Sequence, residues 1–194
     1  MTTYIVSSGV ISSGITLNSG DSELVQSGGT ALDTTINSGG QETVSAGGVD
    51  ISATIKSGGT EFVYGSASAT TVSSGGLEVV ESGGVISGAI VDSGGVLDLS
   101  GDGTISGGTV VSGATVTVTG TSATLSLPNA ASNAGLLQLL SGAVGQVAGT
   151  LANTGTLNVD TENNAAGSQL SVAGSWSTAA RSMLAALGGP AAAR

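Results

Sequence analysis

Apolar and polar positions along the first 118 residues repeat every 19 residues, divided unequally into steps of 11 and 8. Six units follow one another, of which the fourth is two residues short: 6–24, 25–43, 44–62, 63–79, 80–98 and 99–117. Two positions are apolar in every unit. The first position holds Val6, Val25, Val44, Val63, Val80 and Leu99, and the twelfth holds Leu17, Ile36, Ile55, Val72, Val91 and Val110. Because β-branched residues dominate both positions, we expect strands whose side chains stack in two core columns.

A turn follows the second core column at a fixed distance. It contains serine at Ser19, Ser38, Ser57, Ser74, Ser93 and Ser112, each followed by glycine. Only glycine adopts positive φ without steric cost, so these positions predict tight turns. We expect a two-strand unit with two glycine turns, stacked at about 4.8 Å per coil. The frequent glycines oppose a helix.

The repeat decays after Val118, and we expect Pro128 to mark a boundary. Apolar residues still alternate with small or polar ones from Gly135 onward, which predicts irregular further coils. Residues 177–187 are rich in alanine, with Ser177 as a candidate N-cap and Gly188 just beyond the end. The sequence therefore predicts an all-β solenoid, or β-helix, of about six 19-residue coils (1–118), degenerate coils (119–176), and a short helix or tail that caps it (177–194).

Composition narrows the chemistry further. The 194 residues include 34 Gly but only one Phe, two Tyr and one Trp, so the core must be aliphatic. The net charge of −10 opposes binding to nucleic acid or to an anionic membrane. Without Cys or His, disulfides, thiol nucleophiles and imidazole catalysis are absent. No stretch is apolar enough to span a bilayer. We expect no enzyme, no cofactor and no bound metal.

The aligned units share the pattern Ser/Thr-x-x-Val/Ile-x-Ser-Gly-Gly-x-Glu-x-Val. This pattern resembles the strand-loop-strand repeat of autotransporter passengers, the family of the diffuse-adherence adhesin, over residues 6–118. The resemblance implies a β-helical stalk on the bacterial surface that mediates adhesion, self-association and biofilm growth. Its partners would be further copies of itself, or glycans and proteins of a host or surface. Short members that begin Met-Thr-Thr-Tyr-Ile-Val are similar to this chain, which also shows no signal peptide at its start. The expected location is therefore extracellular or on the cell surface, by an export route that stays open.

The resemblance also implies O-linked heptose, added by a glycosyltransferase to serines of the repeats. The candidate acceptors are Ser27, Ser38, Ser57, Ser74, Ser82 and Ser93. The residues alone account for these serines as turn formers, because their hydroxyls can bond to the local backbone.

Four glutamates recur two residues beyond the Ser-Gly-Gly turn: Glu23, Glu42, Glu61 and Glu78. Stacked carboxylates repel one another, so this acidic strip could bind a divalent cation or a basic ligand. The alternative is a solvated edge that discourages pairing with other sheets, and we favour it. Strict alternation would place each glutamate on the face of the core valine two residues later. We therefore expect a bend or bulge between them.

Other functions have weaker support. Asp102 lies in a single Gly-Asp-Gly string, which lacks the array of a calcium-binding β-roll. Ice or crystal-surface binding would need a regular threonine column, but the tenth position reads Ile15, Thr34, Ala53, Thr70, Ala89 and Gly108. A carbohydrate-active β-helix would need a catalytic cluster that the sequence does not offer. Of the few aromatic residues, we expect Phe62 to fill a gap at the short unit and Trp176 to plug the C-terminal end.

Overall fold

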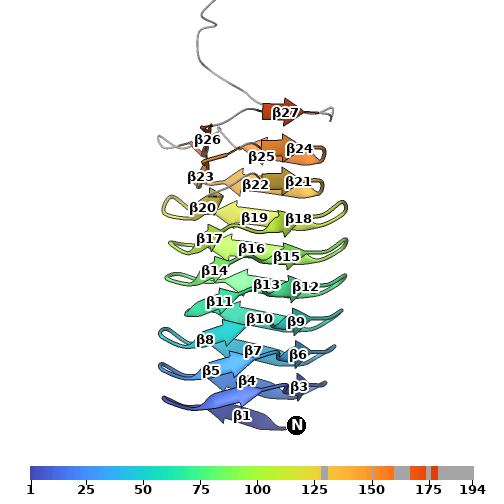
Figure 1. Ribbon diagram of the computed structural model, residues 1–194, viewed down its shortest axis with the longest axis vertical. Coiled ribbons are helices and arrows are strands. Elements are labelled where there is room, and N and C mark those ends of the chain that lie inside the picture. The colour runs from blue at the N-terminus through green and yellow to red at the C-terminus, as the bar shows by residue number, and fades with distance from the viewer. Residues whose placement is uncertain (128–130, 150, 160–166, 174–175, 179–194) are drawn as a thin grey trace, which may run out of the picture.

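The computed structural model describes residues 1–127, 131–149, 151–159, 167–173 and 176–178. These residues form 27 short strands and no helix. The strands build three parallel sheets of nine strands each, and every coil of the chain contributes one strand to each sheet in turn (Figure 1). The predicted all-β solenoid is confirmed.

The first sheet holds the longest strands. In spatial order they are β1 (Thr3–Val6), β4 (Ser22–Val25), β7 (Gln41–Val44), β10 (Thr60–Val63), β13 (Leu77–Val80), β16 (Val96–Ser100), β19 (Thr115–Thr119), β22 (Leu136–Leu140) and β25 (Thr156–Val159).

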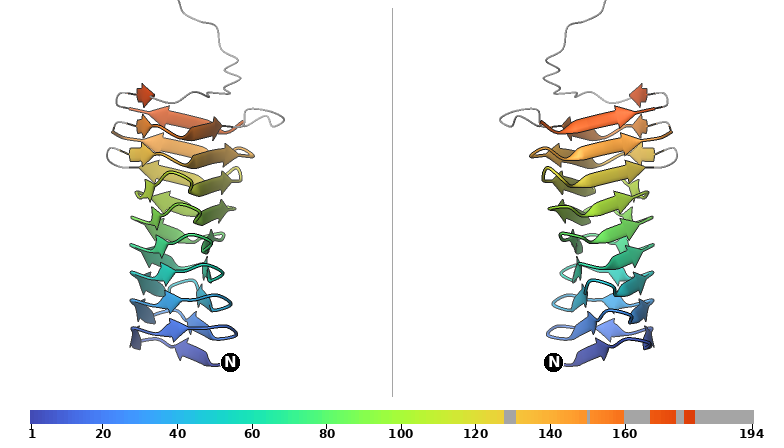
Figure 2. Two further views of the ribbon diagram at one scale, coloured as in Figure 1. Left: turned by 90° about the vertical axis from the view of Figure 1, so that its right-hand side faces the viewer. Right: turned by 90° about the vertical axis from the view of Figure 1, so that its left-hand side faces the viewer.

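The second sheet holds β2 (Ile11–Ser13), β5 (Thr30–Leu32), β8 (Val49–Ile51), β11 (Ser66–Ser68), β14 (Val85–Ser87), β17 (Thr104–Ser106), β20 (Thr124–Leu127), β23 (Val144–Val147) and β26 (Gln169–Val172). The third sheet holds β3 (Thr16–Leu17), β6 (Thr35–Ile36), β9 (Thr54–Ile55), β12 (Thr71–Val72), β15 (Ile90–Val91), β18 (Thr109–Val110), β21 (Ala131–Asn133), β24 (Leu151–Asn153) and β27 (Trp176–Thr178). Figure 2 shows the strands of successive coils lying one above another.

The unit has three strands, so the prediction of two strands with two turns was wrong. The additional corner lies between the second and third sheets and has two residues, of which the first has positive φ. Asp33, Ser52 and Ala69 occupy this corner in three successive coils, with φ of 55°, 65° and 56°. Glycine takes the same place in other coils, at Gly14, Gly88 and Gly107. The corner has no Ser-Gly-Gly signature, which is why the repeat pattern did not indicate it.

Both predicted core columns are confirmed. Val6 pairs with Val25, and the register continues through Val44, Val63, Val80 and Leu99 in the first sheet. None of these six side chains is more than 2% exposed. Leu17 to Val91 form the equivalent buried column in the third sheet, which Val110 continues as a partly buried member.

The short fourth unit loses its two residues from one corner, not from a strand. Tyr64 and Gly65 connect the first sheet to the second, where the preceding coil uses the four residues 45–48. The flanking strands therefore keep their register, with Val63 opposite Val44 and Val80.

Stacking continues beyond the expected change at Val118. Strand β19 spans this position and pairs with β16 and β22. Leu136 stacks on Thr115 and Thr156 stacks on Leu136, which are spacings of 21 and 20 residues. Ser177, the candidate N-cap, lies in β27 and pairs with Ala152. Pro128 and residues 179–194, the greater part of the expected cap, lie outside the described residues.

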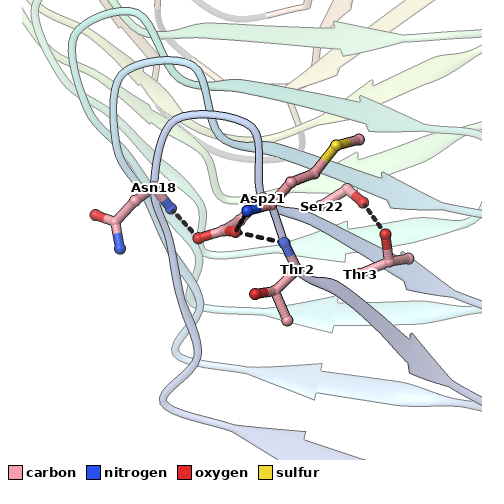
Figure 3. A network of polar contacts seen from close by, with 6 residues as sticks. Thr2, Thr3, Asn18, Asp21 and Ser22 are labelled. Carbon is pink, nitrogen blue, oxygen red and sulfur yellow. Dashed lines mark hydrogen bonds and ion pairs between the residues drawn. The ribbon is translucent and has the colours of Figure 1, made fainter.

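The N-terminal coil is fastened to the second coil through Asp21 (Figure 3). The backbone N–H of Thr2 donates to Asp21 Oδ1 at 2.7 Å, and that of Asn18 donates to Oδ2 at 3.2 Å. Both bonds lower the pKa of the Asp21 carboxyl, and the bond from Thr2 has the larger effect. Asp21 stands where later coils have the second turn glycine. Among the described residues no third-sheet strand lies before β3, so the Leu17 carbonyl that a Cβ at Gly40 would meet has no counterpart at Asp21.

In most later coils the second turn residue is a glycine that lies against the preceding coil, and Ala114 takes this place in the sixth unit. A Cβ on Gly76 would lie 2.6 Å from the carbonyl oxygen of Ile55, which is backbone and cannot move aside. Gly83 differs, because its φ is +82° and a Cβ there would meet nothing within 4 Å.

We therefore expect Gly76→Ala to destabilise the protein more than Gly83→Ala. Gly83→Ala should cost about 1–2 kcal/mol, the penalty of a left-handed backbone. Gly76→Ala carries no left-handed penalty, because the φ of Gly76 is not positive, but it must displace the backbone of the preceding coil and should exceed this range. Urea unfolding followed by circular dichroism measures both, and equal losses would show that the contact between coils is unimportant.

Candidate functional site

The four glutamates of the acidic strip line the interior of the solenoid. Glu23, Glu42, Glu61 and Glu78 are successive partners in the first sheet and are at most 1% exposed. The expected solvated edge and the expected bulge were both wrong. Side chains in a strand alternate between faces, and β4, β7, β10 and β13 follow this rule without interruption. Each glutamate therefore shares the inner face with the core valine two residues later.

Asp50 joins this column from the second sheet. It is 0% exposed and occupies the inward position of β8, between Ala31 and Ala67 in the neighbouring coils. Carboxylate oxygens of Glu42, Asp50 and Glu61 lie within 4.8 Å of one another. We call Glu23, Glu42, Asp50, Glu61 and Glu78 the interior acid cluster. Sequence reasoning missed Asp50 because most of its column is alanine or aliphatic and no other member is charged; a lone acid in such a column was the available signal.

Two threonines border the cluster from the corner between the second and third sheets. Thr34 Oγ1 donates to Glu23 Oε2 at 3.1 Å, and both residues are buried. Thr70 is 1% exposed, and its hydroxyl has no hydrogen-bond partner. Tyr4 precedes Glu23 in the column and Leu97 follows Glu78, so the cluster has an aromatic residue at one end and an aliphatic core at the other.

The cluster has no positive side chain beside it in the part of the chain that the structure describes. Lys56 is exposed at a corner, and the two arginines lie outside the described residues. Both carboxylate oxygens of Glu42, Asp50, Glu61 and Glu78 lack hydrogen-bond partners. Unpaired buried carboxylates are costly because burial removes their hydration.

Burial accordingly dominates the pKa values of these groups. Desolvation is the main reason that the pKa of Asp50 is raised to about 7 and that of Glu78 to about 8, and the charge of Asp50 contributes to the shift of Glu78. Burial also raises the pKa of Glu42 and Glu61 well above the usual value. Neighbouring carboxylates add to both shifts, chiefly Asp50 for Glu42 and Glu78 for Glu61.

In later coils, by contrast, buried polar side chains have hydrogen-bond partners. Asn133 donates through Nδ2 to Asn153 Oδ1 at 2.8 Å and to the carbonyl oxygen of Thr156 at 3.0 Å. The N–H of Gly135 donates back to Asn133 Oδ1 at 3.2 Å. The fold can therefore satisfy buried polar side chains across coils, which makes the unpaired acid cluster an exception in this protein.

The six candidate acceptor serines are all exposed. Ser38, Ser57, Ser74 and Ser93 form one ridge at the corner between the third and first sheets. Ser27 and Ser82 lie at the corner between the first and second sheets. Ser82 donates a hydrogen bond to Asp102, which distinguishes it from the others. Exposure makes these serines accessible to an enzyme, and their glycosylation stays a prediction.

Phe62 and the tenth position of the repeat differ from what the sequence predicted. Phe62 lies between two inward residues of β10 and is partly buried on the outer face, so it does not fill a gap in the core. Its neighbour Tyr64 is 41% exposed. The side chain of Trp176 lies outside the described set. The tenth position of the repeat also faces inward, because Thr34, Ala53, Thr70 and Ala89 are buried.

The fold defines the class of protein: a parallel, three-sided β-solenoid with an aliphatic core. Comparison with solved structures shows that the chain is similar to a TibC-catalysed hyper-glycosylated fragment of TibA, with 26% sequence identity and a TM-score of 0.53. The match covers 92% of this chain and 80% of that fragment. The likeness supports an autotransporter-passenger-like, adhesin-like β-solenoid. No protein-family model matches the sequence, and no curated protein sequence matches it.

None of the described residues belongs to a helix that is long and apolar enough to cross a membrane.

The raised pKa values predict how stability depends on pH when divalent cations are removed by a chelator. Asp50 and Glu78 hold protons in the folded state up to about pH 7 and 8, whereas the unfolded groups lose them near pH 4. The folded state therefore binds more protons in this window, so the free energy of unfolding falls as pH rises from about 4 to 8. Each unit of pKa shift is worth about 1.4 kcal/mol. Urea midpoints at pH 5 and pH 8 measure the effect, and a higher midpoint at pH 8 would contradict it.

Proposed function

We propose that this chain is a non-enzymatic, adhesin-like stalk, displayed outside the cell or on a bacterial surface, that promotes attachment or self-association. The observation that carries the proposal is the continuous three-sided solenoid with an exposed serine ridge. This architecture offers long outer faces and repeated corners for contact, and its likeness to the TibA fragment supports the same conclusion.

Self-association is favoured by the N-terminal end of the solenoid. Among the described strands, β1, β2 and β3 are the terminal strands of the three sheets, and each pairs with one strand only, on its C-terminal side in the stack. Ile5, Val10 and Ile11 near this end are 58%, 46% and 68% exposed. Open strand edges and exposed apolar residues are typical of surfaces that pair with a second chain. Contact with glycans or proteins of a host surface is the alternative partner.

Modification of the serine ridge is part of this proposal. TibA is described as hyper-glycosylated by TibC. The ridge of Ser38, Ser57, Ser74 and Ser93 presents one exposed hydroxyl group per coil, at about 4.8 Å intervals. Such a regular row would suit an enzyme that adds sugars, heptose among them, to successive coils.

A second candidate function is binding to ice or another crystal surface. The outward position of the third sheet carries Thr16, Thr35, Thr54 and Thr71 as successive partners, and Ile90 interrupts the column before Thr109. This regular column was not apparent from the tenth position of the repeat. Thermal hysteresis of the purified protein would favour this function over adhesion.

A carbohydrate-active β-helix has less support. The acid cluster is enclosed, with every carboxylate at most 1% exposed, so it cannot contact a polymeric substrate from outside.

Cells that produce the chain test the leading proposal. We expect protease treatment of intact cells to remove the protein, and deletion of the chain to reduce sedimentation of cell aggregates and attachment to a surface. The intact mass of the natively produced protein should exceed the sequence mass by whole sugar units. A variant with alanine at Ser38, Ser57, Ser74 and Ser93 should lose much of that added mass. A protease-protected, unmodified chain whose deletion leaves attachment unchanged would refute the proposal.

A further inference from the structure

The interior acid cluster has the composition and spacing of a cation site. Glu42 and Asp50 come from one coil and Glu61 from the next, and their closest oxygens lie within 4.8 Å of one another. Two ligands on opposite sides of a calcium ion are about 4.6–5.2 Å apart, since Ca–O distances are about 2.3–2.6 Å. The three carboxylates can thus surround one such ion without movement of the backbone.

Thr70 provides an observation that does not depend on the acids. Its hydroxyl is buried and has no hydrogen-bond partner, and Thr70 occupies the same position of its coil as Thr34, one residue before the stacked strand residues Thr71 and Thr35. It therefore faces the cluster. The equivalent hydroxyl of Thr34 is occupied by Glu23. Both threonine hydroxyls thus border the cluster, which also contains every buried, unpartnered carboxylate oxygen of the described residues.

Among the described residues, the lack of hydrogen-bond partners is confined to this cluster and Thr70, as other buried polar groups show. Asn133 and Asn153, in later coils, are paired across the stack. The cluster, by contrast, brings five acids together, and no positive side chain of the described residues lies beside them. Buried carboxylates that are not paired either take up protons or coordinate a metal.

We propose that the solenoid interior binds one divalent cation of the calcium type between Glu42, Asp50 and Glu61. Three carboxylates offer up to six oxygens, the lower end of what calcium requires. Magnesium fits less well because it keeps several waters, and the softer transition metals prefer the imidazole and thiolate ligands that this chain lacks. Since the ligands are enclosed on all sides by strands, the ion enters while the coils assemble.

The test uses the full chain, unfolded in guanidinium with a chelator, freed of the chelator, and refolded with CaCl₂, with MgCl₂ or with neither. After desalting, elemental analysis should find about one calcium per chain and little magnesium. At a calcium concentration of about one hundred times the dissociation constant, the melting temperature should rise by roughly 5–10 °C.

Asp50→Asn and Glu61→Gln remove ligand charge without changing side-chain size. Both variants should lose the retained calcium and the calcium-dependent rise in melting temperature. Their metal-free forms should melt no lower than the metal-free wild type, because a buried charge has gone. Asp33→Asn is the matched control: Asp33 is exposed at a corner with φ of 55°, which asparagine tolerates, so this variant should bind calcium as the wild type does.

Measurements on the wild type alone can overturn the proposal. A refolded wild-type chain that retains no calcium, and melts at the same temperature with and without it, would show that protons alone neutralise the cluster. Calcium retained equally by Asp50→Asn and by the wild type would also overturn it, because the ion would then lie elsewhere.

Discussion

The structure depends on one constraint, the in-register parallel pairing of each coil with the next. Residues at the same position of successive coils become direct neighbours, stacked about 4.8 Å apart. Repeated valine or leucine produces the core columns, and repeated serine produces the ridge. The same constraint explains the second turn glycine, where a Cβ at Gly76 would meet the backbone of the preceding coil. It also explains why this position can hold Asp21, against which the described residues place no earlier strand of the third sheet.

The acid cluster is the costly consequence of this constraint. A glutamate repeated at an inward position must stack on its copies, and Asp50 adds a further carboxylate from the facing sheet. Their mutual repulsion and lost hydration oppose folding, and bound protons or a bound cation would offset both. The cluster thereby couples the stability of the solenoid to the medium around it. Such coupling would matter for a protein displayed outside the cell, where the concentrations of protons and calcium vary.

Much of the fold followed from the repeat because both core columns and the Ser-Gly-Gly turns are periodic in the sequence. The third strand could not be predicted from the repeat. Its corner contains one left-handed residue, and this residue is Asp33, Ser52 or Ala69 as readily as glycine. The glutamates were placed on the wrong face for a different reason. Their charge predicted a solvated edge. The alternation of side chains along each strand places them on the inner face, and this alternation was visible in the sequence. Asp50 was missed because a single acid does not register in a search for repeats.

The central claim is that the glutamates face the interior of an in-register solenoid. The chain contains no cysteine, so single cysteine substitutions report accessibility without background. The most direct test compares the rates at which a thiol reagent modifies Gln41→Cys and Glu42→Cys, adjacent positions on β7, in the native protein. The account predicts rapid modification at position 41 and strong protection at position 42 that is lost on unfolding. Equal rates at both positions in the native state would contradict it, and would return the glutamates to a solvated edge.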